Sequence, residues 1–154
     1  MNCPFCTNEI KNSVFWESDN FMALYNIAPI LPGHSLIISK KHLISVLDLS
    51  DNLLSEMMLF AKRVTGVLLE AYQSDSFNWS VQDNDVAGQT VSHLHLHIVP
   101  RLKGDMTEPG DWYMKISDND KEILDSNQRP KISQKQMKEI VAKLKCIVEN
   151  RSIR

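Results

Sequence analysis

Apolar residues recur every three or four positions after Ser50, as they do on one face of an amphipathic helix. They are Leu53, Met57, Phe60, Val64, Val67, Leu68 and Ala71. Ser50 precedes this run and is a suitable N-cap. A second apolar stripe follows Ser133, which fits a capping box with Gln136 and predicts a helix over residues 133–150. The pattern therefore predicts two main helices.

Shorter segments have the character of strands. Residues 15–25 are β-like and are broken by the polar turn 18–20, which predicts a hairpin. Residues 35–39 follow a Pro-Gly turn and predict a third strand, and the alternation over 77–82 and 93–99 predicts two half-buried strands. About five strands joined mostly by short turns predict an α+β fold, in which an antiparallel sheet carries helices on one face.

The domain organisation is expected to be simple. A length of 154 residues suits one domain over residues 1–154. The segment 104–131 is polar and irregular, and a loop of that length is usually functional. It contains Trp112 and Tyr113, so we expect it to dock onto the leaving-group side of a site or onto a dimer surface.

Composition excludes some classes of function. The hydrophobic fraction of 43% and the charged fraction of 23% are ordinary for a globular protein. A formal net charge of -2 supplies no field that would attract nucleic acid or an anionic membrane. No apolar run approaches the roughly 20 residues of a membrane-spanning helix, and the polar N-terminus does not resemble a signal peptide. We therefore expect a cytoplasmic protein with no nucleic-acid or membrane partner.

Three of the five histidines are His93, His95 and His97. Alternate residues of a strand share one face, ~6.6 Å apart per step. An exposed polar face accounts poorly for three histidines that alternate with apolar residues, because buried imidazole nitrogens need partners. Two chemistries use such a row: a catalytic metal centre with three histidine ligands, and nucleophilic catalysis by one imidazole.

The residues around this row favour a phosphate ligand. Residues 88–91 offer backbone N–H groups after a glycine, and Gln89 and Thr90 offer side-chain donors. Arg101 and Lys103 add positive charge after the row. Donors of this kind suit phosphate oxygens, which favours nucleophilic catalysis over a metal centre without deciding between them.

Cys3 and Cys6 form a C-x-x-C pair, and Cys146 stands apart on the apolar side of the last predicted helix, where we expect it to be buried. Three cysteines are a poor count for disulfides, so the pair indicates metal binding or redox activity, the alternative being two inert thiols. A structural zinc takes four ligands, for which His42 and His93 are candidates.

The segment His93-Leu94-His95-Leu96-His97-Ile98-Val99, preceded by Gly88-Gln89-Thr90-Val91, resembles the signature of the histidine-triad superfamily. The run 82–101 is most similar to the fragile-histidine-triad branch of dinucleoside polyphosphate hydrolases, and the resemblance covers roughly residues 13–105. It implies a five-stranded antiparallel sheet with two main helices, a homodimer, and cleavage of a nucleoside phosphate through a covalent nucleotidyl-histidine.

The resemblance also implies residue roles. His95, the middle histidine, would be the nucleophile that attacks the α-phosphate, and His97 would help to bind and stabilise that phosphate. Asn26 would bind sugar hydroxyls. The remaining phosphate-binding residues would be Gln82, Gly88, Gln89, Thr90 and Val91.

The cysteine pair resembles zinc-containing histidine-triad proteins. That similarity implies a structural Cys2His2 zinc site at Cys3, Cys6, His42 and His93, which would pin residues 1–12 to the sheet. His93 would then be a metal ligand and not a free acid or base. The fragile-histidine-triad branch lacks the cysteine pair, so the chain combines features of two branches.

Beside the hydrolase, three alternatives remain open at the level of sequence. A nucleoside phosphoramidase or a nucleotidyl transferase would share the first half-reaction with a hydrolase, and they differ only in the leaving group or acceptor. A nucleotide-binding regulatory module would turn over slowly and act through its bound state. A metallohydrolase would use the histidine row to hold a catalytic metal.

Overall fold

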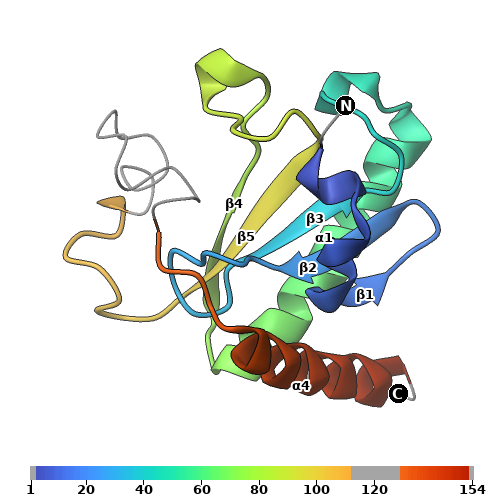
Figure 1. Cartoon of the computed structure of the whole chain (residues 1–154). Coiled ribbons are helices and arrows are strands. Elements are labelled where there is room, and N and C mark those ends of the chain that lie inside the picture. Colours follow the sequence, from blue (N-terminus) through green and yellow to red (C-terminus); the bar gives the residue numbers. More distant parts are fainter. Residues whose placement is uncertain (1–2, 112–128, 153–154) are drawn as a thin grey trace.

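The computed structural model describes residues 3–111 and 129–152. An antiparallel sheet of five strands, in the order β1-β2-β3-β5-β4, lies at its centre (Figure 1). The strands are β1 (Val14–Glu17), β2 (Phe21–Tyr25), β3 (Ser35–Ser39), β4 (Ser76–Ser80) and β5 (His95–Arg101). The helices are α1 (Asp51–Tyr72) and α4 (Gln134–Ser152). The predicted α+β fold is confirmed.

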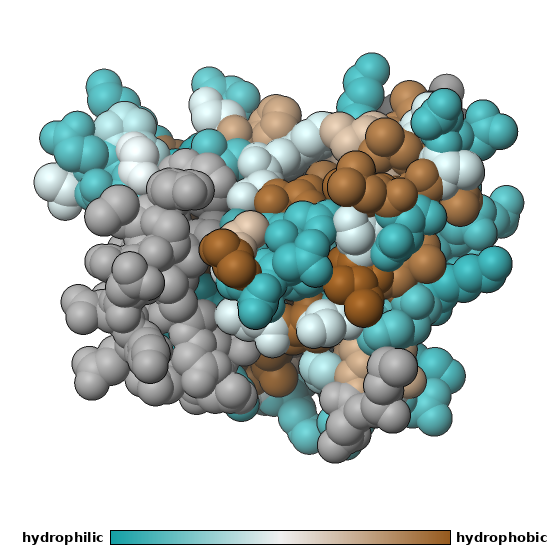
Figure 2. Space-filling view, turned by 90° about the horizontal axis from the view of Figure 1, so that it is seen from above, coloured by the Kyte–Doolittle hydropathy of each residue, from teal (hydrophilic) through white to brown (hydrophobic). Residues whose placement is uncertain are grey.

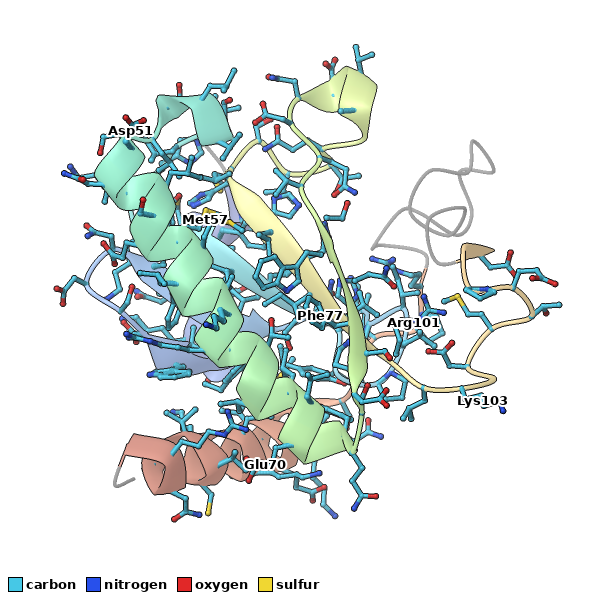
Figure 3. All side chains as sticks on the ribbon, turned by 180° about the vertical axis from the view of Figure 1, so that it is seen from behind. Asp51, Met57, Glu70, Phe77, Arg101 and Lys103 are labelled. Carbon is cyan, nitrogen blue, oxygen red and sulfur yellow. The ribbon has the colours of Figure 1, made fainter. Side chains whose placement is uncertain are left out.

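The two helices cover one face of the sheet, and Figure 3 shows this face with α1 in front. The main core lies between these layers, where Leu96 and Ile98 of β5 pack with Val64 of α1 and Leu144 of α4. Figure 1 shows the N-terminal segment on the opposite face. Alternation along β5 therefore turns its leucine and isoleucine toward the helices and its histidines toward the N-terminal segment.

Four short 3-10 turns complete the described part of the chain. They are η1 (Pro4–Cys6), η2 (Asn8–Asn12), η3 (Val46–Asp48) and η4 (Asp85–Ala87). The turns η3 and η4 lie at the end of the sheet where β5 begins (Figure 1). Figure 2 looks onto this end and shows apolar side chains interspersed with polar ones.

Both predicted helix caps are present. The Ser50 hydroxyl accepts a hydrogen bond from the Leu53 N–H at 3.4 Å. The Ser133 hydroxyl accepts from the Gln136 N–H at 3.2 Å, and the Gln136 side chain accepts from the Ser133 N–H at 3.0 Å. These bonds satisfy N–H groups that a helix leaves free at its start.

The expected burial of Cys146 is wrong, because this cysteine is exposed. The buried stripe of α4 runs through Met137, Val141, Leu144 and Val148. Cys146 is two residues from Leu144 and from Val148, and a spacing of two turns a helical side chain away from the face of its neighbour.

The fifth strand begins two residues later than predicted. It runs from His95 to Arg101, and His93 lies before it in a bend. The Leu94 N–H donates to the Leu43 carbonyl at 2.6 Å, so this part of the chain pairs with a loop and not with β3. The three histidines are therefore not successive positions of one strand, and His93 is free to serve a different site.

The turn before β3 requires glycine at position 33. Gly33 has a φ of +90°, and a Cβ atom there would lie 2.8 Å from Pro100 Cγ and 2.9 Å from Tyr72 Cδ2. Gly33→Ala is expected to lower the free energy of unfolding by about 2–4 kcal/mol, from backbone strain and the two clashes together. Urea denaturation measures this loss.

Gly104→Ala is the matched control for this prediction. Gly104 also has a positive φ, of +81°, but nothing lies within 4 Å of the added Cβ. It should lose only about 1–2 kcal/mol, the strain of the left-handed backbone. Equal losses in the two variants would show that the contacts with Pro100 and Tyr72 are unimportant.

Two further expectations concern the rest of the chain. No helix in the described ranges combines the length and the apolar character needed to cross a membrane. Of the predicted long loop 104–131, residues 104–110 form turns and bends. Trp112 and Tyr113 lie outside the described residues, so the expected docking role of the loop stays a prediction.

Candidate active site

His95 opens strand β5 and is buried on the sheet face opposite the helices. Its Nδ1 lies 2.7 Å from the backbone carbonyl oxygen of His93. A carbonyl oxygen can only accept, so Nδ1 carries the proton and donates it. The lone pair of the neutral ring therefore sits on Nε2. A hydrogen bond that fixes one ring nitrogen in this way is what a nucleophilic imidazole needs.

His97 has the opposite tautomer. The Ile30 N–H donates to Nδ1 of His34 at 3.1 Å, so the proton of the neutral His34 ring is on Nε2. That nitrogen lies 2.9 Å from Nδ1 of His97 and donates to it. His97 consequently carries its own proton on Nε2.

The two triad rings stand side by side with complementary roles. The centroids of the His95 and His97 rings are 4.9 Å apart, with the ring planes at 71°. His95 offers a lone pair at Nε2, and His97 offers an N–H at Nε2. The pair thus combines a nucleophile with a hydrogen-bond donor, which is the combination that attack at a phosphate group requires.

Burial keeps these histidines neutral. It lowers the pKa of His95 and holds the pKa of His97 well below the ordinary value, with nearby histidines adding to the effect. Burial also lowers the pKa of His34 to about 3, helped by the positive charge of Arg129. A neutral imidazole near pH 7 keeps the lone pair that nucleophilic attack uses.

The structure adds His34 and Arg129 to the site residues expected from the sequence. His34 is fully buried, and it sets the tautomer of His97. Arg129 follows the irregular polar segment and has no periodic signal, yet its charge reaches both His34 and His97. The Ile132 N–H donates to the Ile27 carbonyl at 3.0 Å, which ties this segment beside strand β2.

The glycine-led loop before the triad is organised by Gln89. Its side-chain nitrogen donates to the Ile44 carbonyl at 2.8 Å and to the His93 carbonyl at 3.3 Å. Its side-chain oxygen accepts from the Asn84 N–H at 3.0 Å. The Gln89 amide is thus engaged with the backbone, and its proposed contact with phosphate stays a prediction.

The other predicted substrate residues lie around this loop. Gln82 is buried and donates to the Ser80 hydroxyl at 2.7 Å, and it lies next to Gly88. Thr90 is exposed and Val91 is half-buried. The structure therefore brings Gln82 and Gly88 together near the start of β5, and the phosphate-binding roles of all four residues stay predictions.

Asn26 is buried beside the histidine pair. Its side-chain oxygen accepts from the Ala28 N–H at 2.9 Å, and its side-chain nitrogen lies 3.5 Å from Nδ1 of His34, the ring nitrogen that accepts. This position joins Asn26 to the network that ends at His97. The expected contact with sugar hydroxyls stays a prediction.

Arg101 has a structural role that its sequence context did not reveal. Its guanidinium forms two 2.8 Å bonds to the Asp105 carboxylate, which lower the pKa of that carboxyl. It also donates to the Asn78 side chain at 2.8 Å and to the Pro109 carbonyl at 3.0 Å. The Asp105 carboxylate balances the charge of Arg101. The bonds to Asp105 and Pro109 hold the loop that follows β5.

Cys3, Cys6, His42 and His93 form one cluster, as predicted, and their ligand atoms all lie within 4.8 Å of one another. Nδ1 of His93 is 3.5 Å from Sγ of Cys3 and 3.6 Å from Sγ of Cys6, and Nδ1 of His42 is 3.4 Å from Sγ of Cys6. A tetrahedral zinc ion with ordinary bond lengths sets sulfur and nitrogen ligands about 3.6 Å apart.

The hydrogen bonding of His93 also suits a metal ligand. Its Nε2 lies 2.8 Å from the Ser39 carbonyl oxygen and donates to it, which leaves the lone pair of Nδ1 facing the cysteines. Such a bond to the second ring nitrogen is usual for metal-bound histidine. The four residues therefore lie close enough to hold a metal ion, and the tautomer of His93 suits a ligand.

Residues 7–104 match the model of the HIT domain, which covers the sheet, helix α1 and all three histidines of the triad. The chain belongs to the HIT-domain family. It shares 35% identity over 106 residues with a bis(5'-adenosyl)-triphosphatase of Dictyostelium discoideum, a match that spans 69% of this chain and 71% of that protein.

The chain is also similar to a second curated protein and to a solved structure. A bis(5'-nucleosyl)-tetraphosphatase [asymmetrical] of Schizosaccharomyces pombe is 32% identical over 111 residues, which are 72% of this chain and 61% of that protein. The solved structure of a hypothetical histidine triad nucleotide-binding protein from Sulfolobus tokodaii superposes with a TM-score of 0.73 at 26% identity, covering 96% of this chain and 93% of that one.

Proposed function

We propose that this HIT-domain protein is a nucleotide hydrolase that cleaves dinucleoside polyphosphates through a covalent nucleotidyl-histidine on His95. The observation that carries the proposal is the 2.7 Å hydrogen bond from Nδ1 of His95 to the His93 carbonyl, which frees Nε2 for attack. The curated relatives support the substrate class, since they are a triphosphatase and a tetraphosphatase of this kind.

The first step is displacement at phosphorus. Nε2 of His95 forms a bond to the α-phosphorus while the bond to the bridging oxygen of the leaving nucleotide breaks. The ring gains positive charge, which the His93 carbonyl stabilises through its bond to Nδ1–H. His97 donates its Nε2–H to an oxygen of the same phosphate, and Arg129 adds positive charge nearby.

The second step is hydrolysis. Water attacks the same phosphorus, the phosphorus–nitrogen bond breaks, and the lone pair returns to Nε2 of His95. One proton of the water stays on the nucleoside monophosphate and the other passes to solvent as this product leaves. Splitting one difficult displacement into two easier ones is the usual gain from a covalent intermediate. The protein's contribution is positioning and charge stabilisation, as for phosphoryl transfer in general.

A substrate panel tests this function. We expect kcat/KM for diadenosine triphosphate and diadenosine tetraphosphate to exceed that for adenosine phosphoramidate. A preference for the phosphoramidate would favour the phosphoramidase alternative, and product formation only with an added acceptor would favour a transferase. A single burst followed by very slow release would favour the regulatory binding module. The cytoplasmic location expected from composition stays a prediction.

We infer that Cys3, Cys6, His42 and His93 hold a structural zinc ion. Two cysteines and two histidines whose ligand atoms lie within 4.8 Å of one another form a ligand set that zinc prefers. Four protein ligands leave no open position, so the ion supplies cross-linking of the N-terminal segment to the sheet and no reacting group. This arrangement also weighs against the catalytic-metal alternative, because Nδ1 of His93 faces the cysteines.

Loss of the metal is expected to loosen the N-terminal segment. In Cys3→Ser, the zinc content should fall from about one ion per chain, and amide hydrogen exchange in residues 3–12 should lose most of its protection. Elemental analysis and hydrogen-exchange mass spectrometry measure the two effects. Cys146→Ser is the matched control, since that cysteine is exposed and distant from the cluster in sequence. Unchanged zinc content in Cys3→Ser would contradict the assignment.

We propose that two copies of the chain pair through β4. Among the described residues β4 has a strand neighbour, β5, on one side only. Phe77 faces Pro100 in that ladder, and because proline has no N–H, the backbone groups of Phe77 point to the open edge. The Phe77 side chain is 44% exposed. An open edge with an exposed aromatic ring suits antiparallel pairing with a second β4.

Light scattering is expected to give twice the mass of one chain. Phe77→Glu should give the mass of a single chain, because two like charges would meet across the paired edges. Leu47→Glu, at an exposed leucine of η3, is the control and should remain dimeric. A dimer that survives Phe77→Glu would move the interface away from β4.

A further inference from the structure

Phe5 lies between the two cysteines of the metal cluster, and its ring contacts two histidines. The centroids of the Phe5 and His93 rings are 5.7 Å apart with the planes at 83°. The centroids of the Phe5 and His95 rings are 5.6 Å apart with the planes at 73°. Both are edge-to-face arrangements, which aromatic rings favour. The cysteine pair therefore carries a ring that touches the nucleophile.

His93 makes a second connection between the same two sites. Its Nδ1 faces Sγ of Cys3 and Cys6, and its backbone carbonyl accepts the proton of His95 Nδ1. Its Nε2 is held by the Ser39 carbonyl. Any shift of His93 toward or away from the cysteines consequently moves the acceptor that fixes the tautomer of His95.

The backbone around Phe5 has few other anchors. Residues 4–6 form a single 3-10 turn, with backbone bonds from Cys6 to Cys3 at 3.0 Å and from Thr7 to Pro4 at 3.4 Å. The Phe5 ring is half-buried and packs at the edge of the small apolar cluster on this face of the sheet. An isolated turn of this length is weak by itself, so the cysteine ligands are its main attachment.

We propose that metal binding at Cys3, Cys6, His42 and His93 orients the nucleophile, with Phe5 as a positioning residue that holds the His95 ring. The proposal rests on the function proposed above, in which His95 is the nucleophile. A structural metal site thereby acquires a role in catalysis without contributing a group to the reaction. Small displacements of a reacting group are costly, so loss of the Phe5 ring should slow the attack by about 10-fold to 100-fold.

Phe5→Leu tests the proposal, because leucine keeps an apolar side chain and removes the ring. We expect one zinc ion per chain to be retained, kcat for diadenosine triphosphate to fall, and KM to change little. Phe5→Tyr restores the ring and should restore kcat. Ile10→Ala is the matched control, since Ile10 packs against the same apolar cluster and should leave both constants unchanged.

A measurement made without substrate reports the orientation of the His95 ring directly. In protein labelled with 15N-histidine, the ring nitrogen shifts of His95 should report a single Nδ1–H tautomer in the metal-loaded wild type. Phe5→Leu, and wild type stripped of metal with a chelator, should both show a second tautomer or broadened signals. If Phe5→Leu loses zinc, the spectrum of the chelated wild type tests whether metal binding orients the His95 ring.

Two results would overturn the proposal. One is a His95 spectrum that does not change on metal removal. The other is a zinc-loaded Phe5→Leu enzyme with unchanged kcat, including the case in which only KM rises and Phe5 acts as a binding wall. These outcomes are distinct from failure of the proposed function, which would appear as activity retained in His95→Ala.

Discussion

His95→Ala is expected to reduce kcat for diadenosine triphosphate by about 10⁴-fold or more, because the nucleophile is lost and no intermediate can form. The nucleotide should still bind, since the remaining contacts with phosphate and sugar come from other residues. Steady-state kinetics measure the loss of turnover, and calorimetry with adenosine monophosphate measures the retained affinity. Circular dichroism establishes that the variant is folded.

His97→Ala is the informative comparison for this variant. His97 contributes a hydrogen-bond donor and not the attacking atom, so its removal is expected to lower kcat by about 10²- to 10³-fold. The two residues belong to the same strand, in which His95 is buried and His97 is half-buried. If His97→Ala were the more severely impaired, the nucleophile would have to be reassigned.

Acid is expected to destabilise the protein strongly through His34. The pKa of His34 is about 3 in the folded chain and about 6.5 when unfolded, so between these values the unfolded state binds a proton that the folded state refuses. Stability is therefore greatest above pH 6.5 and falls as the pH drops toward 3. One such histidine costs about 1.4 kcal/mol per pH unit, or about 5 kcal/mol over the whole window.

Urea denaturation at several pH values, for wild type and His34→Asn, measures this effect. Asparagine removes the titrating group, so the slope of the unfolding free energy against pH between 4 and 6 should be shallower by about 1 kcal/mol per pH unit. Ligand protonation at the metal cluster contributes equally to both proteins and cancels in the difference. Parallel slopes would show that His34 is protonated at an ordinary pKa in the folded protein.

Local signals in the sequence predicted much of the fold. Ser50 and Ser133 cap their helices because side-chain capping depends only on neighbours three residues away. The apolar stripes of the two helices report burial directly, and the alternation of residue types located β4 and β5, so the α+β arrangement followed from them. Alternation did not give the burial of β4, where Phe77 is 44% exposed. The cluster of Cys3, Cys6, His42 and His93 was also anticipated, from the C-x-x-C spacing together with the resemblance to zinc-containing histidine-triad proteins.

The details that sequence did not reveal depend on contacts between distant segments. His93 leaves the strand because Leu94 pairs with Leu43, which alternation alone does not show. His34 and His97 are 63 positions apart, so their hydrogen bond has no local signature. Arg101 looked like a phosphate ligand from its position after the triad, yet Asp105 pairs with it.

Intact-protein mass spectrometry during turnover of diadenosine triphosphate tests the central claim most directly, with wild type and His95→Ala examined side by side. A covalent mechanism predicts that the wild type shows a transient adduct of one adenylyl group, which disappears as substrate is exhausted. His95→Ala should show neither adduct nor cleavage. Cleavage by His95→Ala at the wild-type rate, with no adduct on either protein, would contradict the nucleotidyl-histidine mechanism.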